Sequence, residues 1–255
     1  MWYNPIELAK ANYKNVNPAL RVNTVCADEC ERYLLRHVGT LFTWKGRKMG
    51  LFNKFFNMTR KPEGFLGKMM VNTMNKGHGA MSDWGMDFLD GIKAANICEL
   101  GCGGGKSAAK LMKRYPEAKL TAVDYSPVSV KAATELNAAE INAGRCTVLQ
   151  GDVSELDLPG KPFDLATAFE TVYFWPGIEK CFSRVAENLS DGGYFLIVNE
   201  TDGTDPIGRK WEKKIDGMTV YTKEELTEAL KNAGFSEVKC FNHGKLPWLA
   251  VLAEK

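Results

Sequence analysis

The residues with the clearest potential for chemistry form a glycine-rich segment, residues 99–107, with the sequence ELGCGGGKS. An apolar run precedes this segment and a helical pattern follows it, so the glycines are expected in a turn between a buried strand and a helix. A turn without side chains lets a ligand approach the backbone closely. Glycines that serve the turn alone are the alternative, but three of them in register after a buried strand favour a ligand site.

The spacing of these glycines separates three classes of ligand-binding turn. A dinucleotide fingerprint, G-x-G-x-x-G, fits at Gly101 and Gly103 but has Lys106 at its third glycine. A P-loop, G-x-x-x-x-G-K-[ST], fits at its Gly-Lys-Ser end but would begin at Leu100. Both patterns therefore fail. The remaining pattern is E-x-G-x-G-x-G, which begins at Glu99.

Three acidic residues follow the next three predicted strands. Asp124 comes after the second strand, Asp152 after the third and Glu170 after the fourth. Because parallel strands present their carboxyl ends at one edge of a sheet, these carboxylates are expected near the glycine turn. Each also has a plainer interpretation as a solvated turn residue, and Glu99 as a buried charge with a structural partner. NAD enzymes place an acid after the second strand too, so Asp124 alone does not identify the ligand.

Together these motifs resemble those of class I S-adenosylmethionine-dependent methyltransferases, over roughly residues 91–255. The resemblance implies S-adenosyl-L-methionine as cofactor and S-adenosyl-L-homocysteine as product. It implies that Glu99 stands below the methionine part of the cofactor and that Asp124 binds the ribose hydroxyls. It also implies that Asp152 takes the adenine amino group and that the next residue packs on the ring. The implied cofactor-binding residues are Glu99, Gly101, Cys102, Gly103, Gly105, Asp124, Tyr125, Ser126, Asp152, Val153 and Glu170.

The expected catalytic residues are Glu170, Tyr173 and His78. In the family, the segment after the fourth strand lies near the transferable methyl group, which brings in Glu170 and Tyr173. Glu170 is a general base, a cofactor contact or a loop carboxylate, and the sequence leaves these roles open. Tyr173 is either a packing residue or a substrate contact. His78 precedes the first strand, where related enzymes often fold a segment over the cofactor, and it is a base, a cofactor contact or a surface residue.

The acceptor is expected to be a small molecule. The sulfonium donor is already activated, so in-line displacement requires mainly alignment of the acceptor and exclusion of water, not a fixed triad. The chain lacks the N-P-P-[YF] and D-P-P-[YF] motifs of nucleobase N-methyltransferases and the Pro-Cys pair of C5-cytosine enzymes, and its net charge of +2 does not favour nucleic acid. A protein or nucleic-acid methyltransferase and a non-catalytic cofactor-binding protein of the same fold stay open as alternatives.

The elements that must position these residues alternate along the second part of the chain. Amphipathic patterns predict helices at residues 106–114, 127–143, 178–189 and 222–234, with Ser126 and Thr222 as N-caps. Short apolar runs predict strands at residues 97–100, 120–123, 146–149, 163–169, 194–198, 238–241 and 248–252. The last two strands are joined too closely for a crossover helix, so they must be antiparallel. The expected fold is α/β, a doubly wound seven-stranded and mainly parallel sheet with a C-terminal antiparallel hairpin.

The chain is expected to divide near residue 91. Residues 1–90 are predicted to form a helical N-terminal cap or lid, and residues 91–255 the cofactor-binding core. Residues 1–90 hold 13 Lys and Arg against 8 Asp and Glu, whereas residues 91–255 hold 20 against 23. This basic excess either solvates helix surfaces or favours an anionic acceptor, and both interpretations stay open. The sequence does not give the oligomeric state.

The composition is that of a globular protein, since 45% of the 255 residues are hydrophobic and 25% are charged. No run approaches the roughly 18 apolar residues of a membrane span. The N-terminus shows no signal-peptide pattern, so a cytoplasmic location is expected. The seven cysteines are scattered without a C-x-x-C pair, and there are three histidines. This usage predicts reduced thiols and no metal site.

Overall fold

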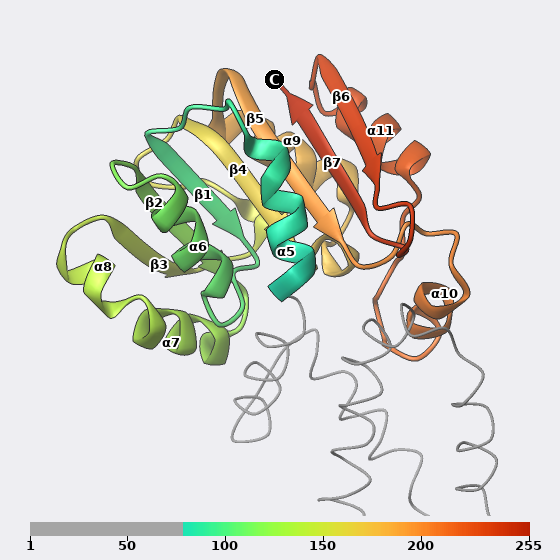
Figure 1. Ribbon diagram of the computed structural model, residues 1–255, viewed down its shortest axis with the longest axis horizontal. Coiled ribbons are helices and arrows are strands. Elements are labelled where there is room, and N and C mark those ends of the chain that lie inside the picture. The colour runs from blue at the N-terminus through green and yellow to red at the C-terminus, as the bar shows by residue number, and fades with distance from the viewer. Residues whose placement is uncertain (1–78) are drawn as a thin grey trace, which may run out of the picture. The chain divides into compact units, whose positions relative to one another are not determined.

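A seven-stranded sheet forms the centre of the computed structural model, which describes residues 79–255; residues 1–78 lie outside the described part (Figure 1). The strand order is β3-β2-β1-β4-β5-β7-β6. Strands β1 to β5 pair in parallel, and β7 runs antiparallel to both β5 and β6. The predicted doubly wound sheet with a C-terminal antiparallel hairpin is therefore confirmed. The strands are β1 Asn96–Leu100, β2 Lys119–Asp124, β3 Cys146–Gln150, β4 Phe163–Phe169, β5 Leu189–Asn199, β6 Glu237–Asn242 and β7 Leu249–Glu254.

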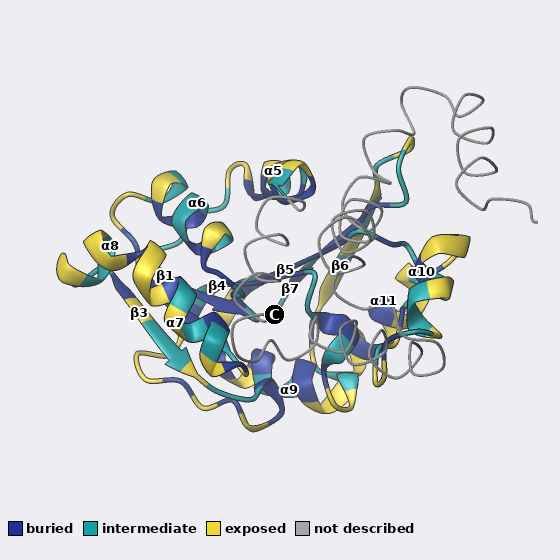
Figure 2. Ribbon diagram, turned by 90° about the horizontal axis from the view of Figure 1, so that it is seen from below, coloured by how far each residue is buried: buried dark blue, intermediate teal, exposed yellow. Residues whose placement is uncertain are grey.

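Helices cover both faces of this sheet (Figure 2). On one face lie α5 Gly79–Met86 and α6 Lys106–Arg114, and on the other lie α9 Ile178–Asn188 and α11 Lys223–Asn232. Because successive side chains of a strand point to opposite faces, β1 contributes to both layers. Ile97 is buried with residues of α5 and α6, whereas Cys98 is buried with residues of α9 and α11. Glu99 therefore faces the same layer as Ile97, beneath α5 and α6.

The segment after β2 forms two helices, α7 Pro127–Leu136 and α8 Ala138–Asn142, where the sequence predicted one. The predicted N-cap is confirmed, because the Ser126 hydroxyl accepts hydrogen bonds from backbone N–H groups in the first turn. The helical path is interrupted at Asn137. Its buried side-chain amide donates to the carbonyls of Gly105 and Ala133, each at 3.0 Å. This contact ties α7 to the glycine turn, which a helical pattern alone does not reveal.

Two other elements differ from the sequence prediction. Strand β5 begins at Leu189 instead of near residue 194, because the chain already pairs with Phe163 before an irregularity in register. The segment after β5, where no helix was predicted before residue 222, contains the helix α10 Pro206–Glu212. Asp205 caps this helix by accepting from two backbone N–H groups. The predicted N-cap Thr222 of α11 Lys223–Asn232 is confirmed, and it forms a capping box with Glu225.

Helix α5 and the 3₁₀ turn η2 Asp87–Leu89 pack directly on the sheet, although they precede the boundary predicted at residue 91. A Cβ atom at Gly85 would lie 2.4 Å from a methyl carbon of Val198, so glycine permits the close approach of α5 to β5. Residues 79–90 thus pack with the core, and the rest of the predicted cap stays a prediction outside the described residues. None of the helices between residues 79 and 255 is long and apolar enough to cross a membrane.

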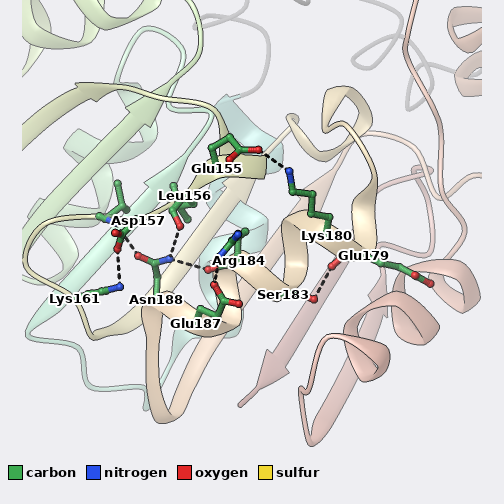
Figure 3. Close-up of polar contacts among 11 residues, drawn as sticks. Glu155, Leu156, Asp157, Lys161, Glu179, Lys180, Ser183, Arg184, Glu187 and Asn188 are labelled. Carbon is green, nitrogen blue, oxygen red and sulfur yellow. Dashed lines mark hydrogen bonds and ion pairs between the residues drawn. The ribbon is translucent and has the colours of Figure 1, made fainter.

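The side chain of Asn188, at the end of α9, fixes the segment that leads into β4 (Figure 3). Its Oδ1 accepts from the backbone N–H of Leu158 at 2.9 Å. Its Nδ2 donates to the carbonyls of Leu156 and Arg184 at 3.2 and 2.8 Å. Asn188 is 1% exposed, and its hydrogen bonds to Leu156 and Leu158 are buried, so water cannot replace its side chain at these two backbone groups.

Replacing Asn188 by Ala is expected to lower the free energy of unfolding by about 2–3 kcal/mol, because buried backbone groups lose their partners. Glu187→Ala is the matched control. It removes an exposed ion pair with Arg184 on the same helix and is expected to cost less than about 0.5 kcal/mol. Urea denaturation of the two variants measures the difference, and equal losses would contradict the assigned role of Asn188.

Candidate active site

A cleft of ≈ 330 Å³ lies at the carboxyl ends of β1, β2 and β4. This edge is where doubly wound sheets bind their ligands. The glycine turn forms one wall, the segments after β2, β3 and β4 form others, and α5 and α6 close one end. The sequence-predicted site residues that line the cleft are Glu99, Gly101, Cys102, Gly103, Asp124, Tyr125, Asp152, Val153 and Glu170.

The three glycines of the turn all have positive φ but differ in their surroundings. A Cβ atom at Gly101 would lie 2.0 Å from the Thr171 hydroxyl oxygen, and one at Gly105 would lie 2.4 Å from the Asn137 amide nitrogen. Gly103 has open space around that position and lines the cleft. Gly105 does not line the cleft but packs against α7. Gly101 and Gly105 are therefore required for packing, and Gly103 leaves room for a ligand beside the backbone.

Asp124 ends β2 and is held by the glycine turn. One carboxylate oxygen accepts from the backbone N–H of Gly103 at 2.8 Å, and the other accepts from that of Ser126 at 2.8 Å. Burial raises the pKa of Asp124 above its ordinary value, and these two N–H groups oppose that rise. A carboxylate has about four lone-pair positions, so it can still accept hydrogen bonds from a ligand in the cleft.

The residues around Asp124 and Asp152 divide into cleft-lining and structural groups. Tyr125 is 52% exposed and lines the cleft. Ser126 is buried and does not line it, because its side chain caps α7. Asp152 and Val153 line the cleft at the start of the 3₁₀ turn η3 Val153–Glu155. One oxygen of Asp152 accepts from the Ser154 N–H at 2.8 Å, which leaves its second oxygen for a ligand.

Glu99 lines the cleft but is only 2% exposed, and its Oε2 atom has no hydrogen-bond partner. Burial raises the pKa of its carboxyl group well above the ordinary value, and the nearby charge of Asp124 raises it further. A buried carboxyl oxygen without a partner is costly. Its position in a cleft indicates that a donor group of a ligand completes its hydrogen bonding.

Glu170 follows β4 and has a backbone φ of 59°, the one positive φ at a non-glycine residue within residues 79–255. Such a conformation is costly and is often found at functional sites. Its side chain accepts from the Tyr173 hydroxyl at 3.0 Å and also from the backbone N–H of Glu200. Burial raises the pKa of Glu170 well above its ordinary value, and the Glu200 carboxylate raises it further. The carboxyl group of Glu170 is thus held in place at the cleft wall.

Tyr173 lies behind this carboxyl group, in the 3₁₀ turn η4 Val172–Phe174. It is 3% exposed and does not line the cleft. Its hydroxyl donates to Glu170 and accepts from the Thr201 N–H at 3.4 Å. The structure therefore places Tyr173 where it positions Glu170, away from the lining of the cleft.

The carboxyl group of Glu200 is expected to make the stability of the folded protein depend on pH. Burial, followed by the charge of Asp205, raises its pKa from 4.5 to about 7. Between these values the folded state binds more protons than the unfolded state, so stability falls as the pH rises from 4.5 to about 7. Glu200→Gln removes this dependence. The wild type should therefore lose about 2–3 kcal/mol of stability, relative to this variant, when the pH is raised from 4.5 to 8.

Chemical denaturation at the two pH values tests this expectation. Glu228→Gln, at an exposed position of α11, is the control for loss of a carboxyl group. A difference between wild type and Glu200→Gln that is the same at both pH values would contradict the raised pKa.

Several cleft residues were not predicted from the sequence. They include Thr171 and Phe174 after β4, Ser82 in α5, and Ser107 and Lys110 in α6. Position directly after a parallel strand was a usable signal for Thr171, and Ser82 lies in the segment before the first strand that related enzymes often fold over the cofactor, but nothing local marks Lys110. The predicted residue His78 lies outside the described residues. Within residues 79–255, no group of three or more His, Cys, Asp and Glu side chains is arranged to hold a metal ion.

Residues 97–193 match a family described as a methyltransferase domain. This range begins in β1 and ends in β5, so it contains the glycine turn and all four acidic residues that line the cleft.

Known proteins give similar results. The chain is 26% identical over 174 residues to malonyl-[acyl-carrier protein] O-methyltransferase of Geobacter sulfurreducens, covering 63% of each chain. It is 26% identical over 181 residues to sterol 24-C-methyltransferase of Yarrowia lipolytica, covering 66% of this chain and 46% of the relative. The chain thus spans less than two thirds of each relative. The structure of Haemonchus contortus phosphoethanolamine N-methyltransferase 2 with S-adenosyl-L-methionine superposes with a TM-score of 0.65 at 16% identity, covering 80% of this chain and 60% of that one.

Proposed function

Since the core of this chain belongs to the class I S-adenosylmethionine-dependent methyltransferases, we propose that the protein transfers a methyl group from S-adenosyl-L-methionine to a small-molecule acceptor. The observation that carries this proposal is the convergence of the family's motif residues on one cleft at the carboxyl edge of the sheet. Relatives named for a sterol and for a malonyl group on a carrier protein support an acceptor other than nucleic acid.

The residues in the cleft fit the cofactor. The unpartnered oxygen of Glu99 suits the positively charged amino group of the methionine part. Gly103 leaves room beside the turn, and Asp124 beside it suits the ribose hydroxyls. Asp152 and Val153 are the residues that would hold the adenine ring. Gly105 and Ser126, also expected to bind the cofactor, act through the turn and the α7 cap instead.

When bound, S-adenosylmethionine supplies a methyl group on a sulfonium, which leaves as a neutral thioether as the acceptor attacks in line. The role of this chain is to align the acceptor, exclude water and take up the acceptor's proton. Glu170 is the proton acceptor in this proposal, because its carboxyl group lines the cleft and is held in place by two donors. Tyr173 positions it, and His78 stays a candidate base outside the described residues.

Thermal unfolding with added ligands tests the proposed function directly. S-Adenosylhomocysteine, S-adenosylmethionine, NAD and ATP are each added at about 1 mM. A ligand present at 100 times its dissociation constant stabilises the folded state by about 2.7 kcal/mol, which gives a clear shift in Tm. We expect shifts with the two adenosyl-sulfur ligands only. A shift with NAD alone, or with none of the four, would overturn the proposal.

Asp124→Ala is expected to weaken the binding of S-adenosylhomocysteine by about 1–3 kcal/mol, because ribose hydroxyls lose their acceptor. Titration calorimetry measures this change. Asp164→Ala serves as the control, since that carboxylate accepts from the backbone N–H groups of Ala95 and Asn96 and is not among the residues lining the cleft. Unchanged affinity in Asp124→Ala would contradict the placement of the adenosyl group.

The alternatives to this proposal differ in the methyl acceptor. A protein or nucleic-acid substrate predicts binding that weakens strongly with salt. A non-catalytic relative predicts cofactor binding without turnover of any acceptor. The expectation of an anionic acceptor rested on the charge of residues 1–90, most of which lie outside the described residues, and it stays a prediction. The same holds for the cytoplasmic location and for the helical cap or lid predicted at residues 1–90, of which only residues 79–90 are described.

A further inference from the structure

Helices α5 and α6 lie side by side on the sheet (Figures 1 and 2). Polar contacts of Gly79, Ser82 and Asp83 with Ser107 and Lys110 join them, and we call this set of contacts the seam. The hydroxyl oxygens of Ser82 in α5 and Ser107 in α6 are 3.3 Å apart. Lys110 of α6 donates from its Nζ to the carbonyl of Gly79 at 2.8 Å and to the carboxylate of Asp83 at 2.6 Å. These contacts fix the first turn of α5 against the middle of α6.

Part of this seam lines the cofactor cleft. The lining residues are Gly79, Ser82, Lys106, Ser107 and Lys110. Helix α5 lies before the range of residues 97–193 that matches the methyltransferase domain, so the family match gives it no role. A helix outside the matched domain therefore forms a wall of the cleft.

The floor of this end of the cleft is Glu99, which faces the layer of α5 and α6. Its Oε2 atom is buried without a partner, which indicates a donor group on a ligand. Lys106 and Lys110 bring positive charge to the same cleft, and the serine pair brings hydroxyls. In that pair one hydrogen is used between the two oxygens, so the other hydroxyl hydrogen can be donated to a ligand.

An acid together with cationic and hydroxyl donors is complementary to a zwitterion that carries both an ammonium and a carboxylate group. We propose that the seam recognises the amino-acid end of S-adenosylmethionine, with the remaining hydroxyl hydrogen of the Ser82–Ser107 pair donated to its carboxylate. Lys110 is a positioning residue that keeps α5 at the cleft through Gly79 and Asp83. This inference rests on the proposed function. It makes α5 the element that distinguishes the whole cofactor from adenosyl compounds that lack the amino acid.

Calorimetric titration of the full chain with two probes tests the inference. S-Adenosylhomocysteine carries the amino-acid end, and 5′-methylthioadenosine shares its adenosyl thioether but lacks that end. The wild type is expected to bind S-adenosylhomocysteine at least roughly tenfold more tightly. Ser82→Ala and Lys110→Met are each expected to weaken that binding by roughly five- to thirtyfold and to change the affinity for 5′-methylthioadenosine by less than about twofold.

Arg114→Met is the matched control. Arg114 also lies in α6 and forms an ion pair with Asp90, which follows η2, but it does not line the cleft. It is expected to leave both affinities unchanged. Equal losses for both probes in Ser82→Ala, or no loss for either, would overturn the seam's role while leaving the proposed function intact. A wild type that binds neither probe would overturn the proposed function itself, and with it this inference.

Discussion

Glutamine in place of Glu170 is expected to lower the rate of methyl transfer by roughly 100- to 10,000-fold, the usual contribution of a general base. The substitution keeps the shape of the side chain. The amide oxygen can still accept from the Tyr173 hydroxyl and from the Glu200 N–H, so the strained backbone keeps its contacts. What is lost is the ability to take up a proton. Affinity for S-adenosylhomocysteine is therefore expected to stay within about threefold.

The measurement is formation of S-adenosylhomocysteine with an acceptor found by screening small molecules. Tyr173→Phe is the companion variant, because it removes one donor to Glu170 and leaves the carboxyl group. The Tyr173 hydroxyl lowers the pKa of Glu170, so its removal is expected to move the acidic limb of the pH–rate profile to higher pH. Unchanged turnover in Glu170→Gln together with a lower Tm would instead assign Glu170 a structural role.

Gly101→Ala is expected to destabilise the fold by about 2–5 kcal/mol and to abolish cofactor binding. Two costs add. The φ of 75° disfavours any residue with a Cβ atom by about 1–2 kcal/mol. The new methyl group would also collide with Thr171, whose nearest side-chain atom is 2.0 Å away, and overpacking of this kind costs about 1–3 kcal/mol.

Gly192→Ala separates these two costs. Gly192 has a φ of 73° but nothing within 4 Å of the added methyl group, so it is expected to lose only about 1–2 kcal/mol. Adding Thr171→Gly to Gly101→Ala removes the three colliding atoms. Urea denaturation of the double variant and of Thr171→Gly gives the stability cost of Gly101→Ala without the collision. This cost is expected to be no larger than that of Gly192→Ala in the wild type. A cost that persists in full would show that contact with Thr171 is not its cause.

Local sequence patterns predicted most of the architecture because each relevant signal lies within a few residues. The strand before the glycine turn, the helix at residues 106–114 and the caps at Ser126 and Thr222 all formed as expected. The acids after β2, β3 and β4 meet at one cleft because parallel strands bring their carboxyl ends together.

The features that were missed depend on contacts between distant segments. Gly101 and Thr171 touch across the cleft wall, and Asn137 breaks the helix after β2 by bonding to the turn at Gly105. No local pattern contains such pairs. The helix α10 is different, because it was missed although Asp205 followed by Pro206 is a local signal for a helix start. Tyr173 was expected among the catalytic residues because of its place after the fourth strand; its side chain is buried beside Glu170 and does not line the cleft, and its role stays a prediction.

The insertion of β7 between β5 and β6 has a consequence for biosynthesis. Each of strands β2 to β5 pairs in parallel with a strand that is translated before it. The other edge of β5, however, forms its hydrogen bonds only with residues 249–254 of β7. Until that segment is translated, β5 presents unpaired N–H and C=O groups next to an apolar surface, and such edges promote aggregation. The nascent core therefore depends on its last strand to close. Truncation within residues 249–254 is expected to yield chains that chaperones retain and proteases degrade.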